Sequence, residues 1–402
     1  MNRRLVVVGY GMVAHRLVEH LRELDLTGDW SIVVLAEENR PAYNRVALSS
    51  YLDGGSREGL TLPVAGPLGG PRADLRLGCP AVAVDPSARL VHSAAGDVLR
   101  YDALVLATGA RPFVPPVPGH DLTGCFAYRT FDDVEAIRAH AVRGRPAVVV
   151  GGGLLGLEAA NGLRLRGMAP SIVESAPHLM AAQLDAGAGR VLRELATDLG
   201  LRVHCPASLA SVEAGTDGNV GGVRLADRTV LPADLVVFAA GVRARDDLAE
   251  GGGWDRGDRG GFLVDDFCRT SAPAVWAIGD CAAVRGRCHG LVATGYRMAE
   301  SVARQLVGLP AERFDDTGNA ISLKLAGIRV ATVGRANADA AAMEVAFADD
   351  ARRYAKVVLA RETARILGGI LVGATASPKA LRTLVDKVAP AGMEQLLLPG
   401  PG

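Results

Sequence analysis

Two stretches of this sequence, "LVVVGYGMVA" (Leu5–Ala14) and "AVVVGGGLLG" (Ala147–Gly156), repeat one pattern far apart in the chain. Each begins with a β-branched run typical of a buried parallel strand. Closely spaced glycines follow, which let the backbone turn sharply into a helix and approach a phosphate. The pattern predicts an α/β protein with two Rossmann-like dinucleotide-binding folds.

The first copy has the form Gly9-x-Gly11-x-x-Ala14, and apolar residues recur at helical spacing after it. Gly9 permits the tight turn, Gly11 lets the backbone approach a pyrophosphate, and Ala14 is small enough for strand–helix packing. The phosphates would lie against the N-terminus of the helix. The next expected strand ends at Glu37 and Glu38, where a carboxylate can accept hydrogen bonds from a ribose diol.

The second copy has the complete form Gly151-x-Gly153-x-x-Gly156 and also leads into an expected helix. The following strand ends at Glu174, which is 23 residues after Gly151. A carboxylate there accepts hydrogen bonds from a free 2′-hydroxyl and repels a 2′-phosphate. We therefore expect NADH to be preferred over NADPH.

Two such turns imply two dinucleotides, one held permanently and one exchanged. The permanent carrier is most simply FAD, and the exchanged one is NADH. The sequence thus predicts an FAD-dependent NAD(P)H oxidoreductase.

The composition excludes some classes of partner. The chain has 402 residues, with Lys+Arg and Asp+Glu both 44, so its formal net charge is zero. This balance favours neither nucleic acid nor an anionic membrane as a partner. No apolar run approaches the ~20 residues of a membrane span. The glycine-broken start after Arg3 and Arg4 does not fit a signal peptide, and we expect a cytoplasmic protein.

The cysteines indicate no disulfide scaffold and no metal site. None of them forms a CxxC or CxxxxC pair, and the spacing of Cys281 and Cys288 matches no common metal site. We interpret all of them as unpaired thiols. The six are Cys79, Cys125, Cys205, Cys268, Cys281 and Cys288.

Four further segments resemble the two-dinucleotide-domain flavoprotein reductases of the pyridine nucleotide–disulfide oxidoreductase superfamily. "YDALVLATGARPFVPPVPG" (Tyr101–Gly119) resembles the strand and Thr-Gly turn that leave the FAD domain, and "LVVFAAGVRAR" (Leu235–Arg245) the return crossing. "YRTFDD" (Tyr128–Asp133) resembles the start of the NAD domain. "VWAIGDCA" (Val275–Ala282) resembles the strip whose Asp binds the flavin ribityl chain.

A narrower resemblance is to the large subunit of NAD(P)H-dependent nitrite reductases. It is carried by "EENRPAYNRVALSSYL" (Glu37–Leu52), "HLMAAQLD" (His178–Asp185), "HGLVATGYRMAE" (His289–Glu300) and the tail from Phe314 to Pro399. Rubredoxin reductases, ferredoxin reductases and nitrate reductase electron-transfer subunits share most of this plan. The segment 37–52 has no cysteine, so the resemblance implies no redox disulfide. Relatives that reduce Rieske-type ferredoxins tend to have Lys where this chain has Ser50, which weakens that assignment.

The turns and the resemblance together predict the site residues. Glu158, which follows the second turn, and Arg45 are the candidate catalytic residues. No metal ligands are expected. The expected cofactor-binding residues are Gly9, Gly11, Met12, Val13, Ala14, Glu37, Glu38, Arg45, Ala81, Ala107, Thr108, Gly109, Arg129, Gly151, Gly153, Leu154, Leu155, Gly156, Glu158, Glu174, Gly241, Gly279, Asp280 and Thr294.

We expect three domains. The FAD-binding domain is split into residues 1–115 and 243–310, the NAD(P)H-binding domain is inserted as residues 116–242, and a small α+β domain covers residues 311–402.

The resemblance implies an acceptor protein: an iron–sulfur protein, another electron-transfer protein, or a nitrite or nitrate reductase partner. Nitrite reductase subunits continue into iron–sulfur and sirohaem segments that this sequence lacks. We therefore expect either a stand-alone electron donor or a piece of a longer protein, as a monomer or homodimer. The alternatives are an NADH oxidase or small-molecule reductase, and a redox-sensing interaction protein.

A basic surface on the tail would steer an acidic acceptor towards the flavin; a solvated arginine-rich surface is the alternative interpretation. Its residues are Arg352, Arg353, Lys356, Arg361, Arg365, Lys379, Arg382 and Lys387.

Overall fold

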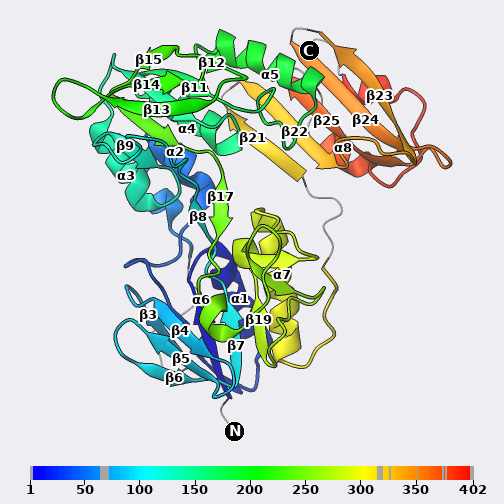
Figure 1. Ribbon diagram of the computed structural model, residues 1–402. Coiled ribbons are helices and arrows are strands. Elements are labelled where there is room, and N and C mark those ends of the chain that lie inside the picture. Colours follow the sequence, from blue (N-terminus) through cyan, green and yellow to red (C-terminus); the bar gives the residue numbers. More distant parts are fainter. Residues whose placement is uncertain are drawn as a thin grey trace. The chain divides into compact units, whose positions relative to one another are not determined.

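The computed structural model describes residues 3–63, 72–314, 320–325, 327–350, 352–373, 375 and 378–398 (Figure 1). The chain divides into two units. Unit 1 comprises Met1–Ala47, Ser56–Arg111 and Val242–Asp316, and unit 2 comprises Leu48–Gly55, Pro112–Gly241 and Thr317–Gly402. The three domains expected from the sequence have other boundaries and stay a prediction.

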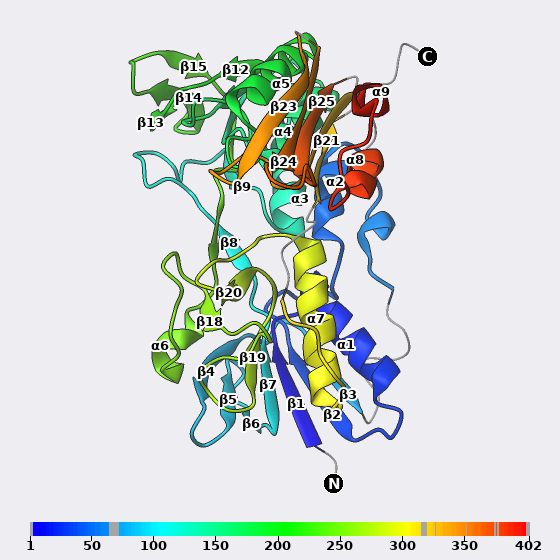
Figure 2. The same ribbon diagram turned by 90° about the vertical axis from the view of Figure 1, so that its right-hand side faces the viewer.

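Unit 1 is built on a parallel sheet with the order β19-β7-β1-β2-β3. Its central strand, β1, is parallel to both neighbours, and its last four residues are buried, as is typical of a parallel sheet covered on both faces. Helices α1 (Met12–Leu24) and α7 (Val292–Leu306) pack side by side (Figure 2). The strands are β19 (Val275–Ala277), β7 (Ala103–Leu106), β1 (Arg3–Val8), β2 (Trp30–Leu35) and β3 (Ala73–Arg76).

Smaller elements complete unit 1. An antiparallel sheet has the order β4-β5-β6, β18 pairs with β20, and β8 pairs with β17 where the chain leaves unit 1 and re-enters it. The bounds are β4 (Ala81–Asp85), β5 (Leu90–Ser93), β6 (Val98–Arg100), β8 (Ala110–Pro112), β17 (Val242–Ala244), α6 (Leu248–Gly252), β18 (Phe262–Val264) and β20 (Ala282–Val284), with short 3-10 helices at Arg45–Ala47, Glu58–Leu60 and Gly279–Cys281.

Unit 2 contains a second parallel sheet with the order β12-β11-β10-β16-β9. Its central strand β10 is again followed directly by a glycine turn and a helix, α4. The bounds are β9 (Cys125–Ala127), β10 (Pro146–Val150), β11 (Ala169–Val173), β12 (Arg202–His204), β16 (Leu235–Phe238), α2 (Leu48–Leu52), α3 (Phe131–His140), α4 (Leu154–Leu165) and α5 (Ala186–Asp198).

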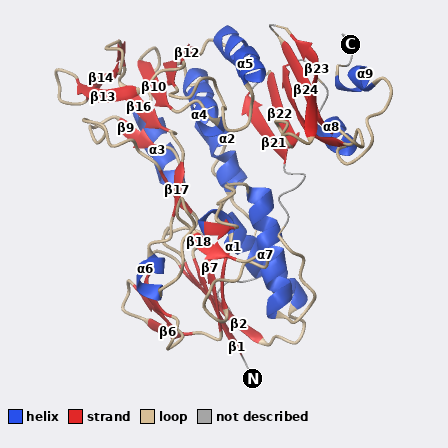
Figure 3. Cartoon of the chain, turned by 45° about the vertical axis from the view of Figure 1, so that its right-hand side comes forward, coloured by secondary structure: helices blue, strands red, loops and turns tan. Residues whose placement is uncertain are grey.

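Unit 2 also holds two antiparallel sheets, with the orders β13-β14-β15 and β21-β22-β25-β24-β23. Helix α5 packs against the second of these, which is the C-terminal sheet (Figure 3). The bounds are β13 (Leu209–Ala214), β14 (Val220–Leu225), β15 (Val230–Pro232), β21 (Ala320–Leu325), β22 (Ile328–Gly334), β23 (Ala342–Asp349), β24 (Arg353–Ala360), β25 (Ile366–Gly373), α8 (Pro378–Leu384) and α9 (Met393–Leu397).

These sheets confirm the predicted fold class, with two Rossmann-like parallel sheets and an α+β C-terminal part. No helix among the described residues is long and apolar enough to cross a membrane.

Candidate functional site

In the first glycine turn, Gly9 is crowded by neighbouring backbone, whereas Gly11 faces free space. Gly9 has a φ of +98°, and a Cβ there would overlap the backbone oxygen of Ala107 on the neighbouring strand connection. Only glycine fits this backbone without strain. A Cβ on Gly11, by contrast, would meet no atom within 4 Å. The turn therefore presents an open cradle at Gly11.

Helix α1 begins directly at this cradle. Gly11 is its N-cap and provides no side-chain cap, and the first turn contains no acidic residue. The free N–H groups of the first turn and the positive end of the helix dipole therefore stay available for an anion. A pyrophosphate fits this arrangement, with Met12 and Val13 at the start of the helix.

Three strand ends meet at the same edge of the sheet. Because β1, β7 and β19 are parallel, the segments following them lie side by side. The hydroxyl of Thr108, after β7, donates to the backbone oxygen of Arg245. Gly279, before Asp280, lies against the side chain of Val13. The expected residues brought together at this edge are Gly9, Gly11, Met12, Val13, Ala14, Ala107, Thr108, Gly109, Gly279 and Asp280.

The N-terminal part of α7 packs against this edge. A Cβ on Gly295 would lie 2.5 Å from a side-chain carbon of Val13, so glycine permits the close approach of α7 to α1. Thr294 beside it is 1% exposed. Ala81, the first residue of β4, lies near the end of β2, since the Cys79 N–H donates to the Ala36 oxygen at 2.7 Å.

Both carboxylates at the end of β2 contact arginines. Glu37 pairs with Arg245, with one contact of 2.8 Å to Oε1, and this hydrogen bond holds the pKa of Glu37 below its ordinary value. Glu38 pairs with Arg45. Arg245 thus closes the site beside Glu37, a role that the sequence reading missed. The available signal was the arginine that ends the return-crossing segment Leu235–Arg245.

The second glycine turn repeats the plan of the first. Gly151 has a φ of +114°, and a Cβ there would lie 2.5 Å from the Ala239 oxygen. A Cβ on Gly156 would overlap the Gly151 oxygen, so this third glycine lets α4 pack closely on the turn. A Cβ on Gly153, the N-cap of α4, would meet no atom within 4 Å. Leu154 and Leu155 form the first residues of the helix.

Glu174 is held against this turn. Its Oε2 accepts a hydrogen bond from the Gly152 N–H at 2.6 Å, and its Oε1 accepts one from the Ala176 N–H at 2.6 Å. A carboxylate oxygen has more than one acceptor position. Glu174 can therefore accept a hydrogen bond from a hydroxyl of a bound ribose while it keeps its hydrogen bonds to the Gly152 and Ala176 N–H groups. Gly241, which follows β16, also faces open space, with a φ of +114°.

A buried polar pair lies near the carboxyl end of the same sheet. Glu158, in α4, is 5% exposed, and Tyr128, after β9, is 4% exposed. The Tyr128 hydroxyl has no hydrogen-bond partner among the described residues. Burial, with a further contribution from the Glu158 charge, raises the pKa of Tyr128 above its ordinary value. The sequence reading named Glu158 but gave no role to this tyrosine.

Arg129 and Arg45 belong to different units. The Arg129 N–H donates to Asp133 Oδ2 at 3.0 Å, just before Thr130 caps α3. Arg45 lies in unit 1 beside Glu38 and over the ring of Tyr43. Their roles at a flavin stay predictions, as do the catalytic roles of Glu158 and Arg45.

The cysteines do not form a redox pair. All six are free, and the stretch that includes α2 contains none. Cys281 is buried next to the Asp280 turn and donates to the backbone oxygens of Leu106 and Ile278. Burial raises the pKa of its thiol. Within the described residues, no cluster of His, Cys, Asp and Glu could hold a metal ion.

Three of the eight basic residues of the tail contact carboxylates in the structure. Arg352 pairs with Asp198 at 2.7 Å, and Arg353 with Asp350 at 3.0 Å. Lys356 is 2% exposed, so it lies inside the protein rather than on its surface. These three residues contribute little to a steering surface, which stays a prediction for the tail.

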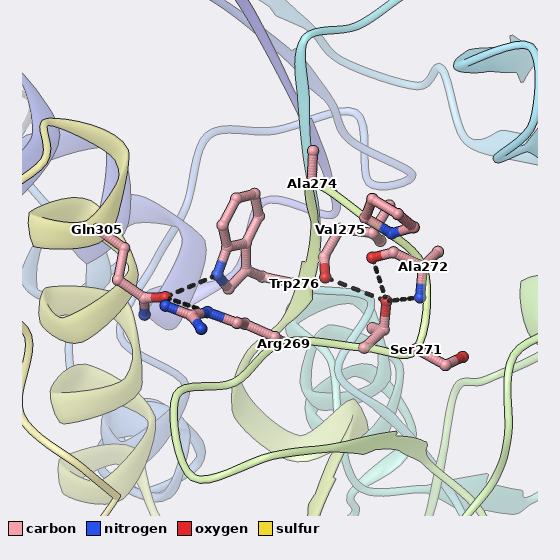
Figure 4. Close-up of a pocket in the computed structure, with 9 residues that line it drawn as sticks. Arg269, Ser271, Ala272, Ala274, Val275, Trp276 and Gln305 are labelled. Carbon is pink, nitrogen blue, oxygen red and sulfur yellow. Dashed lines mark hydrogen bonds between the residues drawn. The ribbon is translucent and has the colours of Figure 1, made fainter.

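A pocket in unit 1 lies away from the glycine turn (Figure 4). It is lined by residues 269–276 and Gln305, whose side-chain oxygen accepts from Arg269 at 2.9 Å and from Trp276 at 3.2 Å. Residues 269–274 precede β19, whereas the residues expected to bind the cofactor follow that strand. The pocket is therefore not part of the dinucleotide site.

Comparison with known proteins gives one family. The family model for pyridine nucleotide-disulphide oxidoreductases matches residues 3–305. The NAD(P)H nitrite reductase large subunit of Klebsiella oxytoca is 42% identical over 399 residues, covering 98% of this chain and 41% of that protein. The nitric oxide reductase FlRd-NAD(+) reductase of Klebsiella pneumoniae is 33% identical over 290 residues, covering 71% and 74%.

A solved structure agrees with this result. The ferredoxin reductase for the CYP199A2 system of Rhodopseudomonas palustris has a TM-score of 0.83 at 27% identity, covering 92% of this chain and 91% of that one. The chain spans less than half the length of the nitrite reductases that it matches. The resemblance inferred from the sequence is confirmed.

Proposed function

Because this chain belongs to the pyridine nucleotide-disulphide oxidoreductases, we propose that it is an FAD-dependent reductase that passes electrons from NADH to an acceptor protein. The observation that carries the proposal is the pair of matched turns, each with one glycine open to space at the start of a helix. A side chain at Gly11 or Gly153 would occupy the volume that a pyrophosphate needs. The cradles therefore fit two dinucleotides.

Unit 1 supplies the residues that would hold FAD. The backbone from Gly9 to Ala14 would bind the pyrophosphate, the pair Glu37–Arg245 would orient the adenosine ribose, and Asp280 would bind the ribityl chain. When bound, FAD supplies the capacity to take a hydride from a nicotinamide and release the electrons to another carrier. The chain's contribution is to position the reacting groups, which can be worth ~7–11 kcal/mol of barrier.

Unit 2 supplies the residues that would hold NADH. The Gly151–Gly153 turn would bind the pyrophosphate, and Glu174 would accept hydrogen bonds from the adenosine ribose. Glu158 and Tyr128 are buried near the end of the sheet where the nicotinamide would lie.

We predict that Glu174→Arg shifts the cofactor preference towards NADPH. The substitution removes a carboxylate that repels a 2′-phosphate and adds a cation that binds one, so the ratio of kcat/KM values for NADPH and NADH should rise roughly 100-fold. Steady-state kinetics with both nucleotides measures this ratio. Glu174→Gln is the matched control: it keeps an acceptor oxygen without adding a cation and should change the ratio less. An unchanged ratio in Glu174→Arg would show that another residue reads the ribose.

We predict that no cysteine carries electrons to the acceptor. Cys288 is the exposed cysteine, yet burial of its sulfur raises the pKa of its thiol to about 11, so the thiolate is scarce at neutral pH. Below this pKa, alkylation by iodoacetamide should speed up roughly tenfold per pH unit. Cys288→Ser should retain full NADH-dependent reduction of an acceptor. Loss of most of that activity in the folded, flavin-loaded variant would point to a thiol relay.

The acceptor is proposed to be an electron-transfer or iron–sulfur protein, or a nitrite or nitrate reductase partner. The names of the relatives support this class, since they include nitrite reductases and a nitrate reductase electron transfer subunit. Reduced enzyme should be reoxidised faster by a ferredoxin or rubredoxin than by oxygen in stopped-flow mixing. Rapid oxygen consumption that added acceptor proteins do not change would favour an NADH oxidase. A cytoplasmic location and a monomeric or homodimeric state also stay proposals.

A further inference from the structure

The segment between β11 and α5, residues 174–185, covers the second glycine turn. Glu174 at its start accepts from the Gly152 N–H, and the Met180 N–H donates to the Gly152 oxygen at 3.0 Å. Leu179 is fully buried, and a Cβ on Gly152 would lie 2.6 Å from one of its methyl carbons. We call residues 174–185 the strap, because they contact the glycine turn at Gly152.

The far end of the strap is fixed by the C-terminal sheet. Asp185 caps α5 by accepting from the Ala188 N–H at 2.9 Å. Its other oxygen, Oδ2, accepts from the Tyr354 hydroxyl at 2.7 Å and lies 2.5 Å from Lys356 Nζ. Tyr354 and Lys356 both lie on β24. One carboxylate therefore ties the strap, α5 and the C-terminal sheet together.

The buried ammonium group of Lys356 is paired with carboxylates. Lys356 Nζ also lies 3.1 Å from Glu344, so the buried ammonium group faces two carboxylates. A buried charge is costly unless it is paired in this way. Burial alone would raise the pKa of Asp185, but the hydrogen bonds from Lys356, Ala188 and Tyr354 lower it below its ordinary value. Asp185 therefore stays ionised at neutral pH.

Helix α5 is attached to the C-terminal sheet at both ends. Near its start, a Cβ on Gly187 would lie 2.6 Å from the Tyr354 ring, so this glycine permits close contact. Near its end, Asp198 pairs with Arg352. Figure 3 shows α5 beside strands β22 to β24. The C-terminal sheet thus fixes the helix from which the strap runs to the glycine turn.

We propose that Tyr354 and Lys356 are positioning residues for NADH: by holding Asp185, they keep the strap seated on the Gly151–Gly153 turn. The proposal rests on the proposed function, since NADH is taken as the ligand of that turn. Its physical basis is preorganisation, because a strap that is already ordered loses less freedom when the nucleotide binds. No contact of either residue with the nucleotide is required.

The test compares Tyr354→Phe and Lys356→Met with the exposed control Lys387→Met, all as FAD-loaded full-length protein. We expect the dissociation constant for NADH to rise roughly 5- to 20-fold in the two variants, with FAD content and kcat at saturating NADH unchanged. Hydrogen exchange measured without nucleotide should speed up at the amides of Met180, Gln183 and Leu184. The control should behave as wild type.

A double variant separates positioning from general stability. Asn can cap a helix as Asp does, so Asp185→Asn should weaken NADH binding on its own, and adding Tyr354→Phe should weaken it little further. Additive losses, or an unchanged dissociation constant and unchanged exchange in folded Tyr354→Phe, would overturn the proposal. If Lys356→Met does not fold, the NADH dissociation constant and the hydrogen exchange of Tyr354→Phe alone test the proposal. If wild-type protein binds no NADH, the proposed function fails, while the exchange data still test the strap.

Discussion

A Gly11→Val variant is expected to fold normally and to be purified without FAD. The backbone at Gly11 has a φ of −89°, which valine adopts readily, and a Cβ there meets no protein atom within 4 Å. The added methyl groups would instead occupy the cradle in front of α1. Overlap of this kind costs about 1–3 kcal/mol, so FAD affinity should fall roughly 5- to 150-fold.

The measurement is the ratio of flavin to protein absorbance, with circular dichroism to confirm folding. Gly9→Ala is the contrasting variant: its Cβ would overlap the Ala107 oxygen at a φ of +98°, so it should lower Tm strongly. Gly251→Val, at an open and exposed glycine outside both turns, should keep FAD. A yellow, fully loaded Gly11→Val protein would contradict the assignment of this turn.

A Gly153→Val variant is expected to keep FAD and lose most of its affinity for NADH. Gly153 also has an extended φ, of −78°, and open space where its side chain would be. The valine would block the pyrophosphate position at the start of α4, and KM for NADH should rise roughly 5- to 150-fold by the same overlap cost. The two glycine variants thus separate the two nucleotides.

The readout is steady-state kinetics together with flavin content. Gly156→Ala is the contrasting variant, since its Cβ would overlap the Gly151 oxygen and should destabilise the sheet–helix packing. Gly251→Val again serves as the neutral control. If Gly153→Val lost FAD and kept its KM for NADH, the assignment of the two turns would have to be exchanged.

Sequence patterns predicted the two nucleotide-binding folds because the residues that define each glycine turn lie close together in the sequence. A strand, a glycine with positive φ and a helix N-terminus follow one another within a few residues, as at Gly9 and Gly151. The acid after the next strand, Glu174, is also close in sequence, and the structure places it against its own turn.

Other features depend on residues far apart in the chain. The Glu37–Arg245 pair joins positions separated by 208 residues, and Asp185 meets Tyr354 across 169 residues. No spacing rule connects such positions without a structure. Charge counting also fails at the basic tail, because it cannot show that Lys356 is buried against carboxylates. Tyr128 belongs to the segment "YRTFDD", but no sequence pattern shows that its hydroxyl is buried near Glu158.

The most direct test of the whole account is anaerobic stopped-flow mixing of the FAD-loaded protein with NADH, followed through the visible flavin absorbance. The account predicts that the absorbance bleaches, with a rate that saturates as NADH increases, and that it returns when an acceptor protein is added. Protein that stays colourless when FAD is offered, or bound flavin that NADH does not bleach, would contradict it.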